Sequence, residues 1–391
     1  MGSSSARTSH RPRNVASPRI LGAAVVEKTV VGARGEWSGA PTRFRYAWLR
    51  CSKSGRACRR IPRGNRQRYK IQVRDAGRRL RLAVRAANGA GSSVARSRPS
   101  RIVSMSPTGP PPPPPPASAC GTRHGRSAIT KVLWILMENK NYTSIVGSRS
   151  APFENQIAQA CGLATNYHAV AHPSLPNYVA LTSGSTQGIT NDAGPGSHRL
   201  DVPTIYHQAY PSAKGYAEGM ASNCATGGGR RYYVRHALWP YYVNGRAGNQ
   251  HTECLANDVP MGTVASGSFH DAVANGRLPA FSLVTPDSCN DMHDCGVATG
   301  DAWLAGVVPR ILAGRDYVRG RLAVVIVFDE NSGASGNQVY CAVISPFTRP
   351  RTRSSVNFTH YSLLRTTEEI LGLRLLGNAR TATSMRAAFG W

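Results

Sequence analysis

Hydrophobic and polar positions alternate in two stretches near the N-terminus. In 43–50 the aromatic residues fall on every second position, and in 80–85 leucine and valine alternate with arginine and alanine. A period of two sends successive side chains to opposite faces, so both stretches predict strands with one buried and one exposed face. Asn88-Gly-Ala-Gly91, which follows, is typical of a hairpin turn. We therefore expect residues 17–105 to form a small β-sandwich.

Beyond residue 125 the pattern changes to short, continuous apolar runs separated by helical patterns. Such runs are typical of strands buried on both faces of a mainly parallel sheet. Their alternation with helices predicts one large three-layer α/β domain over 125–391. The apolar runs lie at 132–136, 280–284 and 323–328, and the helical patterns at 301–312 and 361–373.

Composition marks the boundaries between these parts. The 391 residues allow two or three domains. Residues 106–124 contain an unbroken proline run that ends at Pro116, which predicts a stiff polyproline II linker of about 3 Å per residue. Residues 1–16 are rich in Ser, Arg and Pro without periodicity and predict a disordered basic arm.

The net charge of +28 is concentrated in the N-terminal part. Residues 1–105 hold 25 Lys and Arg against 3 Asp and Glu, whereas the remainder holds 23 against 17. An Arg-covered face could bind nucleic acid or an anionic cell-envelope polymer. The sequence favours a solvated face from an Arg-biased composition over either ligand. No specific nucleic-acid partner is expected.

Nine scattered cysteines without a Cys-x-x-Cys pair favour an oxidising compartment over a zinc ribbon. The pairs Cys51–Cys58, Cys289–Cys295 and Cys224–Cys254 are expected, with one cysteine left over. No apolar run is long enough for a transmembrane helix. The first residues lack the apolar core of a signal peptide. Because the cysteines argue for export, we expect a secreted or cell-surface protein whose natural start lies upstream.

The stretch His172-Pro-Ser-Leu-Pro-Asn-Tyr178 is the first candidate for chemistry. Its two prolines restrict the backbone around Ser174, so a rigid turn can present one hydroxyl at a defined angle. The side-chain amide of Asn177 can donate to an oxyanion. The apolar run from Tyr178 onward predicts a helix. These features suit a serine nucleophile, and the alternative is an ordinary proline-bounded loop.

Polar side chains also follow each of the three apolar runs. In a doubly wound sheet the ligand lies beyond the carboxyl ends of the strands, so these groups should converge on one site. Adjacent carboxylates repel each other unless a cation or an arginine neutralises them. His236 and His360, each a single histidine, are not selected on their own. The groups in question are Glu138 with Asn139, Asp291 with His293, and Asp329 with Glu330.

Seven motifs in one order resemble the phosphoesterase family of the alkaline-phosphatase superfamily, which includes bacterial phospholipases C and acid phosphatases. Within it the nearest likeness is to secreted acid phosphatases that act on phosphatidylinositol 3-phosphate. The stretch 17–105 resembles bacterial immunoglobulin-like modules, through 46–51, 69–80 and the 87–91 turn. The seven motifs, spread over 128–376, are Met137–Tyr142, Ala151–Phe153, His172–Tyr178, Asn290–Asp294, Gly300–Leu304, Phe328–Glu330 and His360–Leu364.

The phosphoesterase resemblance implies a role for each candidate residue. Ser174 matches the nucleophile, Asn177 a contact to a phosphate oxygen, His236 an element of the phosphate pocket, and His172 a histidine whose role is open. One departure from relatives is that Asn331 and Ser332, not further acids, follow Glu330, which leaves metal number open. The implied metal ligands are Glu138, Asn139, Asp329 and Glu330, with Asp291, His293 and His360 at a second metal or the phosphate.

The resemblance implies a three-layer alkaline-phosphatase-like domain with a mainly parallel sheet, preceded by an all-β immunoglobulin-like sandwich. The expected activity is metal-dependent hydrolysis of phosphomonoesters through a phosphoserine, with a phosphoinositide lipid as one candidate substrate. The alternatives are a phospholipase C-like phosphodiesterase and a non-enzymatic envelope-binding protein. The cofactor is a divalent metal ion of open identity, and the chain is expected to be monomeric.

Overall fold

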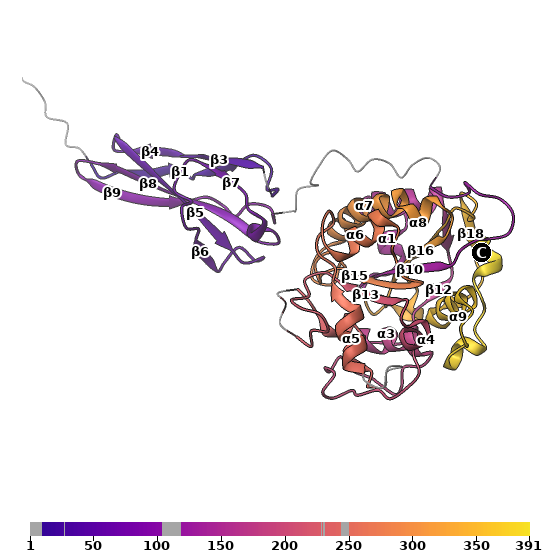
Figure 1. The fold of residues 1–391 in the computed structure, drawn as a ribbon. Coiled ribbons are helices and arrows are strands. Elements are labelled where there is room, and N and C mark those ends of the chain that lie inside the picture. The colour runs from indigo at the N-terminus through magenta and orange to yellow at the C-terminus, as the bar shows by residue number, and fades with distance from the viewer. Residues whose placement is uncertain (1–9, 27, 104–118, 228, 230, 244–249) are drawn as a thin grey trace, which may run out of the picture. The chain divides into compact units, whose positions relative to one another are not determined.

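The computed structural model describes residues 10–26, 28–103, 119–227, 229, 231–243 and 250–391. The chain divides into two compact units, Met1–Gly109 and Pro110–Trp391 (Figure 1). The division falls inside the predicted linker. The proline run itself lies outside the described residues, so its conformation stays a prediction.

The N-terminal unit is built from antiparallel strands around one small core, as the alternating pattern predicts. Trp48 of β5 and Leu80, Leu82 and Val84 of β8 are fully buried in that core. The hairpin turn joins β8 to β9. The likeness to immunoglobulin-like modules stays a prediction. The sheets are β6-β5-β8-β9, β2-β3-β7 and β1-β4, with strands β1 Arg13–Ala16, β2 Arg19–Leu21, β3 Thr29–Ala33, β4 Glu36–Ser38, β5 Arg43–Cys51, β6 Cys58–Arg60, β7 Arg68–Lys70, β8 Arg79–Asn88 and β9 Gly91–Arg96, and a 3₁₀ turn η1 at Val73–Asp75.

The predicted disordered arm over 1–16 is wrong in its last part. Residues Arg13–Ala16 form strand β1, which pairs with β4. Asn14 binds the backbone carbonyls of Ala16 and Glu36, at 2.8 and 3.1 Å. The pairing with β4 and the bond to Glu36 order a polar segment that has no hydrophobic period of its own. Residues 1–9 lie outside the described part.

The C-terminal unit contains an eight-stranded, mainly parallel sheet in the order β14-β13-β15-β10-β16-β17-β11-β18. Only β17 runs antiparallel to its neighbours, β16 and β11. β10 lies between β15 and β16 and is parallel to both, so the carboxyl ends of these three buried strands meet at one edge. The strands are β10 Lys131–Met137, β11 Gly162–Ala164, β13 Ala213–Ala217, β14 Asp258–Pro260, β15 Phe281–Thr285, β16 Leu322–Phe328, β17 Cys341–Ile344 and β18 Thr352–Ser354, with a separate pair β12 Tyr167–His168 and β19 Phe358–Thr359.

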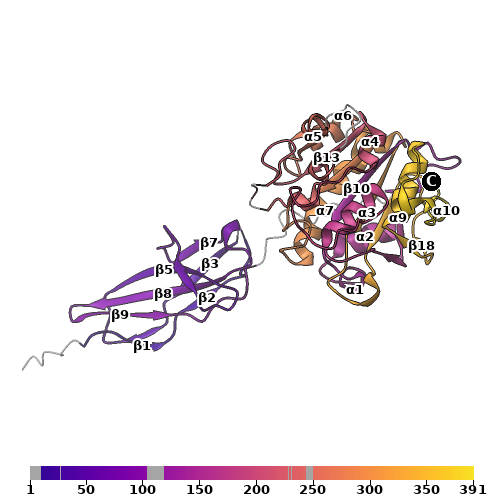
Figure 2. The same cartoon turned by 90° about the horizontal axis from the view of Figure 1, so that it is seen from below.

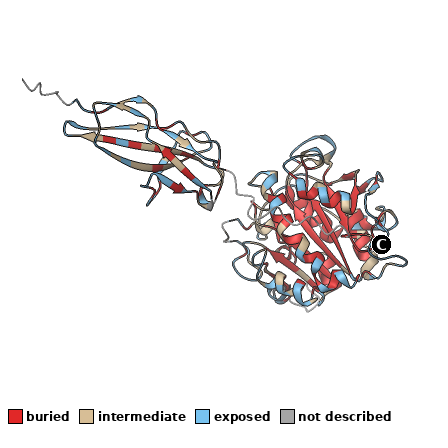
Figure 3. Cartoon of the chain, turned by 90° about the horizontal axis from the view of Figure 1, so that it is seen from above, coloured by how far each residue is buried: buried red, intermediate tan, exposed pale blue. Residues whose placement is uncertain are grey.

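Helices cover both faces of this sheet, which confirms the predicted three layers. α7 contacts α2, α6 and α8 on one face, and α3 contacts α9 and α4 on the other (Figures 1 and 2). The buried residues are concentrated in the strands between them (Figure 3). The helices are α1 Tyr142–Ile145, α2 Pro152–Ala160, α3 Ser174–Ser183, α4 Ile205–Ala209, α5 Gln250–Asn257, α6 Ser268–Asn275, α7 Val297–Ala313, α8 Arg315–Val318, α9 His360–Leu371 and α10 Arg386–Phe389, with 3₁₀ turns η2 Val234–His236, η3 Trp239–Tyr241, η4 Ser335–Asn337 and η5 Gly377–Arg380.

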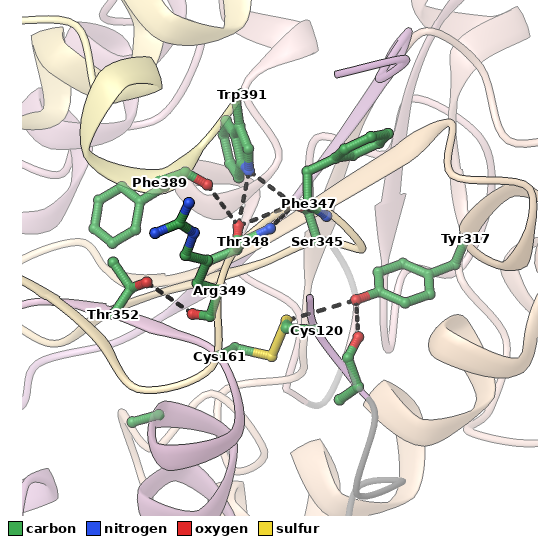
Figure 4. The surroundings of a disulfide bond; sticks show 12 residues. Cys120, Cys161, Tyr317, Ser345, Phe347, Thr348, Arg349, Thr352, Phe389 and Trp391 are labelled. Atoms are coloured by element: carbon green, nitrogen blue, oxygen red, sulfur yellow. Dashed lines mark hydrogen bonds between the residues drawn. A yellow bond between two sulfur atoms is a disulfide. The ribbon is translucent and has the colours of Figure 1, made fainter. Parts of the chain in front are cut away.

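Residues 119–124, predicted to be linker, belong to the C-terminal unit. Cys120 forms a disulfide with Cys161, and its sulfur lies 3.7 Å from the Tyr317 hydroxyl, which also donates to the carbonyl of Ala119 (Figure 4). This disulfide was not predicted, because it joins segments that the sequence places in different parts. It closes a loop 41 residues long, which reduces the conformational entropy of the unfolded chain.

The three predicted disulfides are confirmed, and Cys341 on β17 is the buried free cysteine among the described residues. In the part of the chain that the structure describes, no helix has the length and apolar character needed to cross a membrane.

Candidate active site

The carboxyl ends of β10, β15 and β16 bring the predicted strand-end residues together. Glu138 follows β10 directly, and its backbone N–H donates to the carbonyl of Asp291, beyond β15, at 2.8 Å. The next backbone N–H, of Asn139, donates to Oδ1 of Asp329, beyond β16, at 3.1 Å. Asn139 adopts a left-handed φ of 52°, which turns the chain sharply at the end of the strand. Three segments far apart in the sequence thus meet at one edge of the sheet.

Ser174 is the first residue of α3, so the helix begins four residues before the start predicted at Tyr178, because Pro176 in the first turn costs no helical hydrogen bond. Ser174 lies among these acids. Its hydroxyl donates to Oε2 of Glu138 at 3.1 Å and to Oε1 of Glu330 at 3.4 Å. The positive end of the helix dipole lies at this end of α3 and stabilises negative charge on a group placed there. The side chain is 2% exposed. The Ser174 oxygen therefore lies between two buried carboxylates at the positive end of a helix.

The carboxylates around Ser174 are almost completely removed from water. Burial, with Asp329 and Asp291 close by, raises the pKa of Glu138 well above its usual value. Burial likewise raises the pKa of Asp329 and of Asp291. Oδ2 of Asp329 is buried without a hydrogen-bond partner. Several buried acids with an unpartnered oxygen need protons or a cation for neutralisation.

A divalent cation fits this set of oxygens. Among the described residues no group of three His, Cys, Asp or Glu side chains is already arranged as a metal centre. The candidate metal ligands that converge here also include a side-chain amide and a hydroxyl. Nδ2 of Asn139 donates to Oε2 of Glu138 at 3.0 Å, and the same oxygen accepts from the Ser174 hydroxyl. Carboxylate, amide and hydroxyl oxygens are hard ligands, which suit Mg²⁺, Ca²⁺ or Mn²⁺ more than soft metals.

His236 lies inside this cluster. Its Nε2 is 3.0 Å from Oε1 of Glu138, and its Nδ1 is 3.4 Å from Oδ2 of Asp291. Burial, and then the cation of Arg235, lowers the pKa of His236 well below its usual value, so the ring is neutral. A neutral imidazole wedged between two acids holds their positions.

His172 and His293 lie at the accessible rim. Nδ1 of His172 is 2.5 Å from Oε2 of Glu330, and its side chain is 44% exposed. Nδ1 of His293 is 2.9 Å from Oδ1 of Asp294, with Arg235 3.4 Å from the other ring nitrogen. The ring centroids of His236 and His293 are 6.1 Å apart. His172 and His293 are therefore the more accessible histidines of the candidate site.

The structure does not support the phosphate-contact role for Asn177. Its Oδ1 accepts from the backbone N–H groups of Val170 and Ala171, both at 3.0 Å. Its Nδ2 donates to the carbonyls of Ala171 and Pro173, at 2.9 and 3.1 Å. The Asn177 amide is fully buried, and all its hydrogen bonds go to the backbone. The N–H and C=O groups of the turn before α3 have no partner in a helix or sheet, so the amide supplies one. Asn177 braces the turn that presents Ser174.

His360 is also placed differently from the prediction. Its Nε2 lies 2.6 Å from the backbone carbonyl of Asp329, and its Nδ1 lies 3.1 Å from the Tyr167 hydroxyl. Both ring nitrogens are thus occupied by protein groups, and burial lowers the pKa of His360 to about 4. The neutral ring supports the Asp329 peptide from behind, so a metal or phosphate contact by His360 is not supported.

Comparison with known proteins identifies the family of this chain. Residues 146–374, more than half of the chain, match the Phosphoesterase family. The chain belongs to the Phosphoesterase family. It is 30% identical over 267 residues to a phosphatidylinositol-3-phosphatase of Mycobacterium tuberculosis, covering 66% of this chain and 82% of that protein. An acid phosphatase of Aspergillus fumigatus is 24% identical over 64% of this chain, but only 56% of that protein is covered.

The protein is therefore a phosphoesterase, a hydrolase that acts on phosphoric ester bonds. Among solved structures, a protein of the alkaline phosphatase superfamily from Vibrio parahaemolyticus has a TM-score of 0.44 and 12% identity, over 67% of this chain and 72% of that chain. This score is too low to add to the family assignment.

Sequence reasoning missed two residues of the phosphoesterase site. The Tyr178 hydroxyl donates to Oε1 of Glu138 at 2.5 Å, and its ring stacks on His236 with centroids 5.1 Å apart. Asp192 accepts from the backbone N–H of Leu175 at 2.9 Å. Tyr178 had a signal, since residues four apart share one face of a helix and Ser174 precedes it by four. Asp192 lies in a loop, where no period marks it.

Two cations at the site were also missed as functional groups. The guanidinium Nε of Arg235 lies 3.6 Å from Oδ2 of Asp192, and the side chain is 17% exposed. Lys140 donates to the carbonyls of Asn139 and Met292, at 3.1 and 2.8 Å, and so joins the two loops beyond β10 and β15. Burial lowers the pKa of Lys140. Arg235 thus pairs with Asp192 and lies beside His293, whereas Lys140 holds the loops.

Proposed function

We propose that this phosphoesterase is a metal-dependent phosphatase that cleaves phosphomonoesters through a phosphoserine at Ser174. The observation that carries the proposal is the position of the Ser174 hydroxyl, 3.1 Å from Glu138 and 3.4 Å from Glu330 at the start of a ten-residue helix. A carboxylate beside a serine can accept its proton, and a group of buried carboxylates can hold a cation that activates the hydroxyl.

The oxygens of Glu138, Asn139, Ser174, Asp329 and Glu330 would hold the metal ion. When bound, a divalent cation shields the charge of the phosphoryl group and lowers the pKa of a coordinated hydroxyl. Asp291 and His236 touch this set from behind and keep Glu138 in place.

The residues of the chain divide the proton transfers between them. Ser174 Oγ attacks phosphorus in line with the leaving oxygen, and its proton passes to the carboxylate of Glu138 or Glu330. The P–O bond to the leaving group then breaks as the Ser174–phosphorus bond forms. His293 is more accessible than the buried His236, with its Nδ1 held by Asp294. To protonate the leaving oxygen, its Nε2 would have to leave the 3.4 Å contact with the Arg235 guanidinium and carry the proton itself. Water hydrolyses the phosphoserine afterwards.

The name of the mycobacterial relative suggests the substrate. That protein is called a phosphatidylinositol-3-phosphatase, and this chain spans 82% of it. We propose that this chain also accepts a phosphoinositide monoester. A location outside the cytosol accompanies the proposal, because four disulfides persist best in an oxidising compartment. A monomer is expected.

The test measures hydrolysis of p-nitrophenyl phosphate by the full chain. Ser174→Ala should lower kcat on the order of a thousandfold, because the nucleophile is lost. EDTA should abolish turnover and added Mg²⁺, Mn²⁺ or Ca²⁺ should restore it. Ser150→Ala, at an exposed position in the same unit, is the matched control and should leave the rate unchanged.

Two results would contradict parts of this proposal. Full activity in Ser174→Ala would remove the phosphoserine, and full activity in EDTA would remove the metal. A parallel assay with bis-p-nitrophenyl phosphate decides the bond type. Faster cleavage of the diester would favour a phospholipase C-like phosphodiesterase instead. Release of phosphate from phosphatidylinositol 3-phosphate, against its 4-phosphate isomer, tests the lipid assignment.

A further inference from the structure

The strand register places seven arginines of the N-terminal unit on one face of its four-stranded sheet. Trp48 of β5 pairs with Leu82 of β8, and both are fully buried, so their neighbours in sequence point outward. We call the outward side of the sheet β6-β5-β8-β9 the arginine face. It carries seven arginines: Arg43 and Arg45 on β5, Arg60 on β6, Arg79, Arg81 and Arg85 on β8, and Arg96 on β9.

The arginine face lacks neutralising acids among the residues that the structure describes. Of the two acids described in this unit, Asp75 is buried on the inner side, where it binds Arg50 at 2.5 Å, and Glu36 lies on β4 of another sheet. Arg45 lies directly opposite Arg85 in the ladder. Like charges at directly opposed positions destabilise a sheet, so this face carries a cost that an anion would relieve.

The arginine face differs from the other sheet in extent. The outward side of the sheet β2-β3-β7, identified by the buried Val30 and Tyr69 on its inner side, carries three cations, Arg19, Arg68 and Lys70, at seven outward positions. The arginine face carries seven at fifteen, so the density of cations is about the same on both. Because the arginine face spans four strands, a long anion can contact several of its guanidinium groups at once.

The chemistry of the arginine face limits its ligand. Among the described residues it carries no aromatic side chain, since Phe44, Tyr46 and Trp48 alternate with the outward arginines. Val94, 50% exposed, is its only large, well-exposed apolar side chain in the described part. Single-stranded nucleic acids use aromatic stacking, and membrane surfaces use apolar insertion. The face offers guanidinium groups alone, which recognise phosphate.

The spacing of these groups suits a chain of phosphates. Successive outward residues on a strand are about 7 Å apart, and neighbouring strands are about 5 Å apart. We propose that the arginine face binds a linear polyphosphodiester, a polymer of the glycerol-phosphate type. Such a polymer fits the oxidising compartment that the disulfides indicate, where it would hold the phosphoesterase at an anionic surface.

The experiment measures binding of the full chain to soluble poly(glycerol phosphate) over a range of salt concentrations, with dextran as the uncharged polymer. The face variant is Arg43→Gln, Arg45→Gln and Arg85→Gln together. The matched control removes three exposed arginines elsewhere on the same unit, Arg19→Gln, Arg68→Gln and Arg74→Gln. Both variants change the net charge equally, and all six positions are exposed, so folding should be preserved.

At low salt the face variant should bind at least about tenfold more weakly than the wild type, and the control should bind within about twofold. The slope of log K against log salt should fall by about two in the face variant, as expected for three lost phosphate contacts on a flexible chain. Equal losses in both variants would overturn the proposal. So would tighter wild-type binding to duplex DNA or phosphatidylglycerol vesicles at equal phosphate concentration. Binding is read without turnover, so failure here leaves the proposed phosphatase activity untouched.

Discussion

At the scale of single residues, the same side chains that suggest chemistry can serve the backbone. Asn177 follows Ser174 by three positions and has a donor amide, which made it a reasonable oxyanion contact. Its four hydrogen bonds instead satisfy two N–H and two C=O groups of the turn at 170–173. A buried turn without regular partners needs such a brace, because unsatisfied backbone groups are costly.

Asn177→Ala should therefore reduce stability as well as activity. Four backbone groups lose their partner, and we expect a loss of about 2–4 kcal/mol in unfolding free energy with a kcat at least about tenfold lower. Asn177→Asp keeps the two acceptor contacts and should lose less stability. Denaturant unfolding beside steady-state kinetics checks both. A phosphate contact would behave differently, with unchanged stability and a raised KM.

At the scale of elements, α3 organises the site through its periodicity. Ser174 and Tyr178 are four residues apart, so both face Glu138, and they bind its two carboxylate oxygens separately. The Tyr178 ring also stacks on His236 at an interplanar angle of 5°. One helical turn therefore positions the proposed nucleophile, a buried acid and a neutral imidazole. Tyr178 is a positioning residue that acts through Glu138.

Tyr178→Phe tests this role because it keeps the ring and removes only the hydroxyl. Glu138 loses a hydrogen-bond donor that stabilises its charged form, so we expect metal binding to be about tenfold weaker. The measurement is a titration with Mn²⁺ of protein from which metal has been removed with a chelator. Saturating metal should recover most of kcat, and KM should change little. Tyr361→Phe, on α9 and partly exposed, is the matched control. Metal affinity equal to wild type would show that the Tyr178 hydroxyl is not needed.

Elements were predictable where burial imposes a simple pattern. The runs at 132–136, 280–284 and 323–328 became β10, β15 and β16 within one residue at each end, because strands buried on both faces are continuously apolar. Their parallel order then fixed which polar residues would meet. Side-chain roles were less predictable, since His360 and Asn177 bind backbone groups whose positions only the folded chain defines. The Cys120–Cys161 disulfide escaped prediction for the same reason.

At the scale of the whole molecule, the two units carry unpaired charged groups of opposite sign. The N-terminal unit has unneutralised arginines on its surface, whereas the C-terminal unit has unneutralised carboxylates in its interior. Counting charged residues in the sequence placed the excess positive charge in the N-terminal unit. Which arginines share a face depends on the strand register, which such counts do not give. The buried acids are not confined to the candidate active site. Asp258 on β14 is 2% exposed, and its Oδ2 has no hydrogen-bond partner.

Asp258 should make the stability of the phosphoesterase depend on pH. Burial raises the pKa of Asp258 from 3.8 to about 7, so the folded state binds this proton more tightly than the unfolded state. Protonated Asp258 adds to the unfolding free energy in full below about pH 4, and this stabilisation is lost as pH rises through about 7. Its largest value is roughly 4 kcal/mol, from a pKa difference of about 3 units. The protein should therefore unfold at a lower temperature at pH 8 than at pH 5.

Asp258→Asn measures how much of the pH dependence of stability comes from Asp258 and not from the other buried acids. The amide stays neutral at every pH, so the difference in unfolding midpoint between pH 5 and pH 8 should shrink markedly, with most of the gain in stability at pH 8. Asp201→Asn, at an exposed position, removes the same charge and should keep the wild-type difference. If both variants retain the full difference, Asp258 is ionised at no cost in the folded chain. Its buried carboxylate must then have a neutralising partner that burial and geometry do not indicate.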